Sequence, residues 1–450
     1  MCSKTLHKMR MEAKDLFMSG VQAVNAYDTT RQSLCINEET LTVRDTLGRY
    51  IPFNLKEFRH IFLTAFGKAA GLMARATEDI LQDRITTGVV VVKHGNRIKL
   101  NRSHLLEAAH PLPDKHSLRG AQRIARLVSE AGETDLVLCL LSGGGSALCT
   151  LPDGNITLGD LRMVTRQLLS CGANIHEVNT LRKHVSQIKG GGLARLAYPA
   201  TAVSLIISDV IADRLDSIAS GPTAPDATTF QDAYDIMKKH GLLETVPVAI
   251  RNHIEAGLKG EVPETPKPGD PVFEKTNNII ITHNLDALRA IAQKAVQIGY
   301  RTLMLTSRVQ GDTRNVARIF GTMIKDLSDS ARSQGPICII AGGEMTTRVT
   351  GKGKGGRNCD FGLALSPLIH GLKNTVVLSA GTDGADGPTD AAGVIIDGTT
   401  LHRLQSMGLD HNAALADHDS YSILKKSGDL LVTGPTGTNV MDLQLVLLGQ

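Results

Sequence analysis

The segment Asp135-Leu-Val-Leu-Cys-Leu-Leu-Ser-Gly-Gly-Gly-Ser146 joins an apolar run to a loop of three glycines between two serines. The apolar run predicts a buried strand, and the glycines predict a tight turn after it. Three other apolar runs also end in glycine, serine or acidic residues. With the residues that follow them, these are Ala202–Val210, Pro336–Glu344 and Thr375–Gly393. Segments with helical spacing separate the runs, which predicts an α/β fold with helices on both faces of a mostly parallel sheet.

The length of 450 residues predicts two domains. Prolines 263, 266, 268 and 271 fall between Leu258 and Thr276 and predict a connecting segment there. We therefore expect an N-terminal α/β domain over 1–270 with a Rossmann-like, doubly wound, mostly parallel sheet. A second, smaller α/β domain with a mixed sheet is expected over 271–450.

Composition excludes several classes of function. A net charge of +4, only 3% aromatic residues and no tryptophan argue against a nucleic-acid-binding protein. No apolar run reaches the roughly 18 residues of a membrane span. The seven scattered cysteines indicate a reducing compartment. We expect a cytoplasmic protein with small-molecule partners, no membrane partner and a possible homo-oligomeric state; the basic N-terminus leaves an organellar presequence open.

Three aspartates crowd the glycine-rich segment Ser379–Gly393. Asp383 and Asp386 are three residues apart across a tight turn, so both can point at one Mg²⁺ ion. Asp390 fits a capping or turn role better. Asp209, at another strand end, is the rival metal ligand or the general base. A plain solvated turn is the alternative.

Two glycine-rich loops can supply backbone amides to phosphate groups. The candidate nucleotide-binding residues are Ser142, Gly143, Gly144, Gly145, Ser146, Gly353, Gly355 and Gly356. Arg357 stands at a predicted helix start and can clamp a phosphate. Lys68 opens another predicted helix, where the helix dipole disfavours a cation unless an anion binds nearby. Tight turns, a flexible loop and an ordinary surface lysine remain the alternatives. Together these residues indicate phosphoryl transfer.

Several motifs, taken in order, resemble glycerate 2-kinases of the MOFRL type. They lie at Ser142–Leu148, Asn179–Gly191, Ser208–Val210, Ile218–Thr223, Gly342–Glu344, Gly355–Asn358, Gly381–Gly393, His418–Tyr421 and Thr433–Leu443. The resemblance implies ATP-dependent phosphorylation of D-glycerate to 2-phosphoglycerate, with ATP and Mg²⁺ as cofactors. It also implies catalytic roles for Lys68 and Arg357 and an active site in a cleft.

The chain departs from that family pattern at two places. Ala212 replaces a glycine after Ser208-Asp-Val210, and Cys359-Asp360 replaces Gln-Glu after Gly355–Asn358. Two other functions stay open: an oxidoreductase of the hydroxypyruvate reductase type, and a non-catalytic protein that binds a phosphorylated metabolite. The pattern Gly351-x-Gly353-x-x-Gly356 is the only support for a dinucleotide site, and it lacks the acidic residue expected about 20 residues later.

Overall fold

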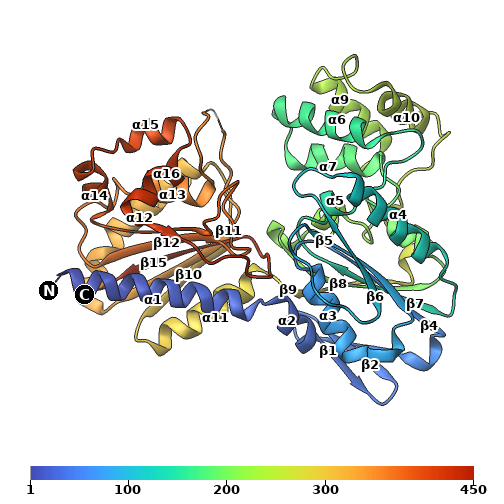
Figure 1. Ribbon diagram of the computed structural model, residues 1–450, viewed down its shortest axis with the longest axis horizontal. Coiled ribbons are helices and arrows are strands. Elements are labelled where there is room, and N and C mark those ends of the chain that lie inside the picture. Colours follow the sequence, from blue (N-terminus) through green and yellow to red (C-terminus); the bar gives the residue numbers. More distant parts are fainter. Residues whose placement is uncertain (1, 350, 450) are drawn as a thin grey trace. The chain divides into compact units, whose positions relative to one another are not determined.

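The computed structural model describes residues 2–349 and 351–449. Contacts divide the chain into two compact units (Figure 1). The parallel-sheet unit comprises Ala26–Thr282. The mixed-sheet unit combines residues up to Asn25 with those from His283 onward. Within the described ranges, no helix is both long and apolar enough to span a membrane.

The parallel-sheet unit contains six parallel strands in the order β6-β5-β4-β7-β8-β9. The strands are β4 His60–Phe66, β5 Thr87–Lys93, β6 Ser103–Ala108, β7 Asp135–Leu141, β8 Thr201–Ile207 and β9 Thr276–Thr282. Counted along the chain from β4, this order is 3-2-1-4-5-6, that of the doubly wound dinucleotide-binding folds. The expected Rossmann-like sheet is confirmed. Its direction of winding reverses between β4 and β7.

Alternating residues of these strands bury both faces of the sheet. Phe62, Phe66, Val137 and Cys139 pack in one cluster with residues of α4, α5 and α8, and the intervening residues are buried on the other face. The helices of the unit are α2 Ala26–Ser33, α3 Ala70–Leu81, α4 Lys115–Ser129, α5 Gly145–Leu148, α6 Leu158–Ser170, α7 Ile175–His184, α8 Gly192–Ala197, α9 Phe230–Lys239 and α10 Val248–Leu258. A small antiparallel sheet adds β1 Leu34–Asn37, β2 Thr40–Arg44 and β3 Tyr50–Asn54.

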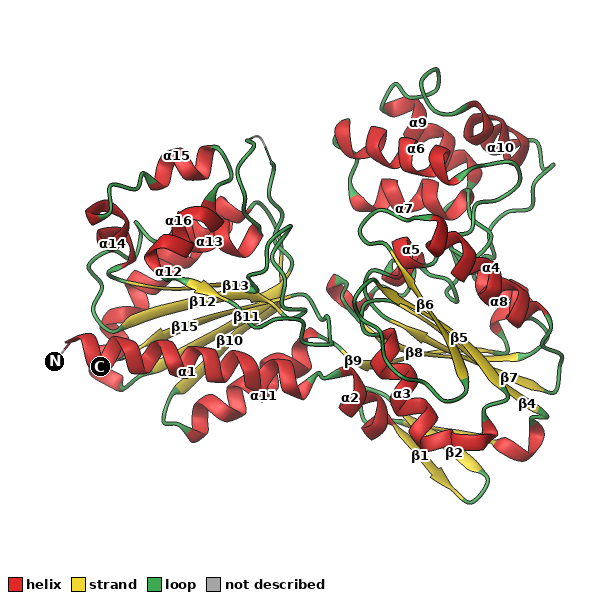
Figure 2. Ribbon diagram, in the orientation of Figure 1, coloured by secondary structure: helices red, strands yellow, loops and turns green. Residues whose placement is uncertain are grey.

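Helices α6, α7, α9 and α10 form a separate apolar cluster, and they lie together beyond the large sheet (Figure 2). Residues 175–197 form two helices, α7 and α8, and residues 230–258 form two more, α9 and α10. Backbone with positive φ at Gly190, Gly191 and Gly241 interrupts them. Val185, Ser186 and Lys189 lie in the first break, between α7 and α8.

The mixed-sheet unit also has six strands, in the order β10-β11-β15-β12-β13-β14, and only β10 and β11 run parallel. The strands are β10 Arg301–Val309, β11 Ile337–Gly343, β12 Thr375–Gly381, β13 Gly393–Asp397, β14 Leu430–Leu431 and β15 Asp442–Leu448. The helices are α1 Cys2–Ala23, α11 Asn284–Gln297, α12 Thr313–Gln334, α13 Arg357–Leu365, α14 Thr400–Ser406, α15 His411–Ala416 and α16 Ser420–Ser427. Helices α1 and α11 cover one face of this sheet and α12–α16 the other (Figures 1 and 2). The expected mixed sheet is confirmed.

The division into units differs from the expected boundary at 270/271. Helix α1 packs on α11, β12 and β15, so the first residues belong with the C-terminal part of the chain. The proline-rich segment 258–276 lies inside the parallel-sheet unit, because β9 follows it and pairs with β8. The chain therefore passes between units twice, after Asn25 and after Thr282.

Buried ion pairs fasten α1 to its unit. Arg10 Nη1 lies 2.6 Å from Asp397 Oδ2 and 3.0 Å from Asp429 Oδ1. Arg403 binds the same two carboxylates, at 3.0 Å and 2.5 Å. Both aspartates are buried, so their charges depend on the two arginines.

These pairs predict a pH-dependent loss of stability. Burial alone would raise the pKa of Asp397, but hydrogen bonds from Arg403 and Thr399 outweigh it and lower the pKa to about 2. The stabilisation is therefore complete above the ordinary aspartate pKa of about 4 and is lost as the pH falls toward 2. We expect Arg403→Met to lower the free energy of unfolding by roughly 2–4 kcal/mol at pH 7. Calorimetric melting of wild type and Arg403→Met at pH 7, 4 and 3 measures the difference in their free energies of unfolding. This difference should become smaller at pH 3.

Arg126→Met is the matched control, because Arg126 forms an exposed pair with Glu130. Such a pair contributes about 1 kcal/mol or less. If the free energies of unfolding of Arg403→Met and wild type differ by the same amount at pH 7 and pH 3, the ion pairs with Asp397 and Asp429 do not account for the pH dependence.

Candidate functional site

The loops after β4 and β7 meet where the winding of the parallel sheet reverses. Gly67, with φ of +140°, lies against Ser142, and a Cβ on Gly67 would stand 2.1 Å from Ser142 Oγ. The Lys68 amide donates to the Gly143 carbonyl at 2.8 Å, and the Ala69 amide donates to Ser142 Oγ at 3.1 Å. Two motifs that lie far apart in the sequence are thus joined by hydrogen bonds. Open parallel sheets bind ligands at this kind of position.

The loop Ser142–Ser146 brings backbone next to two further side chains. Gly144 has φ of +80°, and a Cβ there would lie 3.0 Å from the His110 ring and 3.2 Å from Lys68 Cγ. The tight turn offered as the plain alternative is therefore present. The same turn places the loop beside Lys68 and His110. The sequence did not single out His110, because nothing in its neighbourhood marks it apart from its place before Pro111.

A cavity of about 230 Å³ opens beside this loop, within the parallel-sheet unit. Its walls are the segment 110–113, helices α5, α6 and α7, and residues 185–189. Leucines and valines of α6 and α7 form the apolar part of the lining. The polar lining includes His110, Ser146, Arg162, Arg182 and Lys189. A small cavity with an apolar wall and several cations suits a small anionic molecule.

Two cations of the cavity, Arg182 and Lys189, lack acidic partners. Lys189 is buried and donates from Nζ to the carbonyls of Ser146 at 3.0 Å and Cys149 at 3.1 Å. Burial lowers the pKa of Lys189 to about 8, and the charge of Arg182 acts in the same direction. Burial also lowers the pKa of Arg182. Across the described part of the chain, no carboxylate forms an ion pair with either residue, so the cavity carries excess positive charge.

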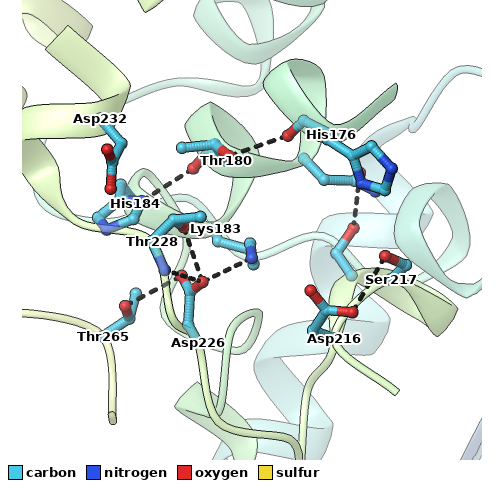
Figure 3. A network of polar contacts seen from close by, with 12 residues as sticks. His176, Thr180, Lys183, His184, Asp216, Ser217, Asp226, Thr228, Asp232 and Thr265 are labelled. Carbon is cyan, nitrogen blue, oxygen red and sulfur yellow. Dashed lines mark hydrogen bonds and ion pairs between the residues drawn. The ribbon is translucent and has the colours of Figure 1, made fainter. Parts of the chain in front are cut away.

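The neighbouring residue Lys183 is different. Its Nζ lies 2.6 Å from Asp226 Oδ1, and both side chains are buried. Figure 3 shows Asp226 surrounded by Lys183, Thr228 and Thr265, and hydroxyls of the two threonines donate to it. This pair fixes the end of α7 to the loop at 226–228. Lys183 is therefore structurally satisfied, while Arg182, one residue earlier, lines the cavity.

A hydroxyl chain reaches the same cavity from the segment after β8. Ser146 Oγ lies 2.7 Å from Ser220 Oγ, which in turn lies 3.4 Å from Asn179 Oδ1. Ala219 and Ser220 both adopt positive φ, of +50° and +63°. Non-glycine residues rarely adopt this conformation, and it is concentrated at functional sites.

Asp209, the predicted general base, follows β8 at the carboxyl edge of the same sheet and is half-buried. Ala212, which stands where the family pattern has glycine, keeps a left-handed φ of +61°. The substitution therefore preserves the course of this loop at the cost of about 1 kcal/mol of backbone strain.

In the mixed-sheet unit, Arg357 begins α13 but is already bound by acids. Its Nε and Nη2 contact both oxygens of Asp442, at 2.5 and 2.9 Å, and Nη1 lies 2.7 Å from Glu344 Oε1. Burial would lower the pKa of Arg357, but Asp442 and Glu344 outweigh it and raise the pKa. The predicted phosphate clamp thus lies in an acidic cluster, and the role itself stays a prediction.

Asp386 and Asp383 make different contacts. Asp386 is buried and caps α13, since Oδ1 accepts from the Asn358 amide at 3.0 Å and Oδ2 from the Cys359 amide at 2.8 Å. A Cβ on Gly356 would lie 2.3 Å from the Asp386 carboxyl carbon, which explains that glycine. Burial raises the pKa of Asp386 to about 6. A carboxylate engaged in this way does not fit the Mg²⁺ role that the sequence predicted.

Asp383 is better placed to hold an ion. Its Oδ1 accepts from the Ala385 amide at 3.1 Å, and it remains half-buried at the end of β12. A Cβ on Gly381 would lie 3.3 Å from Asp383 Oδ1 and 3.4 Å from Asp442 Oδ1, so these two carboxylates flank the same glycine. Asp390 accepts from the Tyr421 hydroxyl at 2.6 Å, and its expected capping or turn role stays a prediction.

In the glycine-rich loop 351–356, several backbone amides donate hydrogen bonds to other residues of the protein. The Gly353 amide donates to the Asp417 carbonyl, and the flanking amides of Lys352 and Lys354 donate to the side chains of Asp417 and Asp419. A Cβ on Gly353 or Gly355 would collide with residues 417–420. Close packing is the structural reason for these glycines, and their nucleotide-binding role stays a prediction.

Asp360, which belongs to the second departure from the family pattern, makes hydrogen bonds within the protein. Asp360 is buried, and its Oδ2 lies 2.9 Å from His418 Nδ1 while Oδ1 accepts from Ser420 at 2.5 Å. The acid therefore ties α13 to the start of α16.

Comparisons with known proteins agree with the motifs. Residues 12–255 match a domain of unknown function, DUF4147, and residues 337–442 match the MOFRL family. A glycerate 2-kinase from Pyrococcus horikoshii is 40% identical over 433 residues, which cover 95% of this chain and 94% of that protein. A relative from Agrobacterium vitis, provisionally named hydroxypyruvate reductase, is 40% identical over 390 residues, 85% of this chain and 86% of that protein.

A solved structure of glycerate kinase from Thermotoga maritima is 36% identical and superimposes with a TM-score of 0.82. The superposition covers 98% of this chain and 100% of the other. Identity of this level over nearly the whole of both chains shows common descent and a common fold. The chain therefore belongs to the MOFRL-type glycerate kinase family.

Proposed function

We propose that the protein transfers the γ-phosphoryl group of ATP to O2 of D-glycerate and releases 2-phosphoglycerate. One observation carries the choice of site: Arg182 and Lys189 bring excess positive charge to a small cavity next to Lys68. Glycerate is a small anion with two hydroxyl groups, and both properties suit this lining. The names of the relatives support the same reaction.

In this proposal the glycerate carboxylate binds the guanidinium of Arg182 through charge-assisted hydrogen bonds. Lys189 holds the carbonyls of Ser146 and Cys149, and so fixes the loop against which the substrate lies. The hydroxyls of Ser146 and Ser220 offer polar contacts for the substrate hydroxyls. Arg182 is then a binding residue and Lys189 a positioning residue.

The remaining residues serve the phosphoryl group. Lys68 lies at the switch point beside the Ser142–Ser146 loop, where its charge offsets the charge that develops on the transferred group. Asp209 is our candidate to accept the O2 proton, because it lies at the same carboxyl edge of the sheet. Catalysis of this kind depends mainly on positioning and on neutralising charge.

For Mg²⁺, Asp383 is our candidate ligand, because both oxygens of Asp386 accept from the α13 amides and Glu344 Oε1 contacts Arg357. A bound Mg²⁺ would neutralise charge on the phosphate groups of ATP. Asp442, both of whose oxygens contact Arg357, orients that arginine within the same cluster. A homo-oligomeric state and a cytoplasmic location stay predictions.

A hydroxypyruvate reductase is the second candidate, favoured by the strand order of the parallel sheet. However, the loop after β4 reads Gly67-Lys-Ala-Ala-Gly71 and lacks the glycine pattern of dinucleotide sites. The loop that carries such a pattern, 351–356, follows β11 of the other sheet and packs on residues 417–420. The site therefore supports the kinase better.

The product distinguishes the candidates. With D-glycerate and Mg·ATP, a coupled assay that contains enolase but no phosphoglycerate mutase should report turnover, because only 2-phosphoglycerate enters it directly. L-glycerate serves as the control substrate. Signal that needs mutase would contradict the position of transfer, and oxidation of NADH by hydroxypyruvate without kinase activity would favour the reductase.

Arg182 and Lys183 form a natural pair of test and control. Arg182→Gln should raise the KM for glycerate roughly 10- to 100-fold, as expected when a charge-assisted hydrogen bond is lost. Its melting temperature should hold or rise, since a half-buried charge without an acidic partner is removed. Steady-state kinetics and calorimetry measure the two effects.

Lys183→Met should behave in the opposite way. It leaves the buried Asp226 without its partner, which costs roughly 3–5 kcal/mol of stability. If Arg182→Gln melts far below wild type while its KM stays normal, Arg182 supports the fold and the proposed carboxylate site is wrong.

Substitutions of Asp383 and Asp386, which both lie in the loop after β12, should have different effects. Asp383→Asn should raise the Mg²⁺ concentration for half-maximal activity several-fold and leave the melting temperature near that of wild type. Asp386→Ala removes the cap of α13 and should cost roughly 2 kcal/mol or more of stability. A Mg²⁺ titration of activity and a melting curve for each variant test both, and an exchange of the two phenotypes would overturn the assignment.

A further inference from the structure

A cluster of metal-binding side chains lies outside the proposed active site, where β5 ends and α4 begins. His94 Nε2 stands 3.3 Å from Asp114 Oδ2, and His116 Nδ1 stands 3.0 Å from the same oxygen. One ligand atom from each of the three residues lies within 4.8 Å of the others. Nothing in the proposed kinase reaction uses this cluster.

The two carboxylate oxygens of Asp114 make different contacts. Oδ1 caps α4 by accepting from the amides of His116 and Ser117, at 3.0 and 2.9 Å. This contact fixes the orientation of the carboxylate and turns Oδ2 toward the two imidazoles. A metal ligand held by hydrogen bonds of its own is the usual arrangement in metal sites.

We propose that His94, Asp114 and His116 bind one dication of the Zn²⁺ type. Two imidazole nitrogens and one carboxylate oxygen favour Zn²⁺, Co²⁺, Ni²⁺ or Cu²⁺ over Mg²⁺. In a tetrahedral zinc site with bonds of about 2.0–2.1 Å, neighbouring ligand atoms are roughly 3.4 Å apart, close to the two nitrogen–oxygen distances here. The rings of His94 and His116 are 52% and 43% exposed, so the ion can enter from solvent and keep water in its open position.

Binding requires no net loss of protons from neutral imidazoles. Each ring that donates a hydrogen bond to Oδ2 moves its proton to the other ring nitrogen and offers the freed lone pair to the ion. The ion then replaces two hydrogen bonds with three coordination bonds. Because the cap uses Oδ1, α4 keeps its N-terminal contacts.

The site would strengthen one wall of the substrate cavity. Asp114 directly follows the segment 110–113, which lines the cavity. Arg162 Nε of α6 donates to the Pro113 carbonyl at 2.6 Å from the other side. An ion that joins the end of β5 to the start of α4 therefore anchors the C-terminal end of this segment, and we assign it a structural role.

Calorimetric titration of the untagged full-length protein with ZnCl₂, without glycerate or nucleotide, tests the site. We expect wild type to bind one equivalent that His94→Ala and His116→Ala each lose or bind at least about tenfold more weakly. His104→Ala is the matched control, since His104 is an exposed histidine on the adjacent strand β6 and should bind as wild type does. Substitution of Co²⁺ adds a visible spectrum that should disappear in the first two variants alone.

The variants leave Asp114 in place, so the cap of α4 survives, and melting curves confirm that each protein is folded. Wild-type protein that binds no Zn²⁺ at micromolar concentrations would overturn the proposal. So would binding that is equal in His94→Ala, His116→Ala and wild type. Because neither substrate is present, either result leaves the kinase proposal untouched.

Discussion

The arrangement of the proposed site depends on buried positive charge that exceeds the buried negative charge around it. Arg182, Lys183 and Lys189 lie within eight residues of one another, and only Lys183 meets a buried carboxylate, that of Asp226. A buried cation without a partner lowers stability, so its retention calls for an anionic ligand or a functional role. Arg182 lines the cavity, and Lys189 holds the loop beside it. The pair Lys183–Asp226 fixes the helix from which Arg182 projects, so one buried charge positions another.

The parallel sheet determines where this charge is located. Its strands reverse their winding between β4 and β7, and the close approach of Gly67 to Ser142 brings the two following loops together. Lys68, His110 and Ser146 come from three different loops, yet the reversal gathers them at one edge. In the mixed-sheet unit the comparable cluster has the opposite sign, with Glu344 and Asp442 on Arg357 and with Asp383 beside Asp442. One unit thus offers a cationic site suited to a carboxylate, and the other offers oxygen ligands suited to Mg²⁺.

Much of the fold could be predicted from periodicity. The apolar run at 135–141 is β7, as its composition predicted. Lys68 and the Ser142–Ser146 loop were each predicted at a strand end, and the structure shows that they are in contact. The domain boundary was not predictable in this way, because α1 returns to the second unit through contacts such as Arg10 with Asp397, which lie far apart in sequence. Proline content marked a long connection correctly, but it could not show that another strand of the first sheet followed.

The site residues also differ in how far the sequence could predict them. Residue type and position suggested Asp386 as a metal ligand, but its hydrogen bonds to the α13 amides exist only in the folded chain. His110 and Arg162 carried no local signal at all. Arg182 stands in a basic stretch that fits a solvated helix face as well as a substrate-facing one when only the sequence is known. Burial separates the two, since the same stretch contains one cation with a carboxylate partner and one without.

The most direct measurement is a crystal structure of the protein with D-glycerate bound. We expect electron density for glycerate in the cavity lined by Arg182 and Ser146, with the glycerate carboxylate within hydrogen-bond distance of the Arg182 guanidinium. Glycerate bound elsewhere, with that cavity filled only by solvent at saturating substrate, would contradict it.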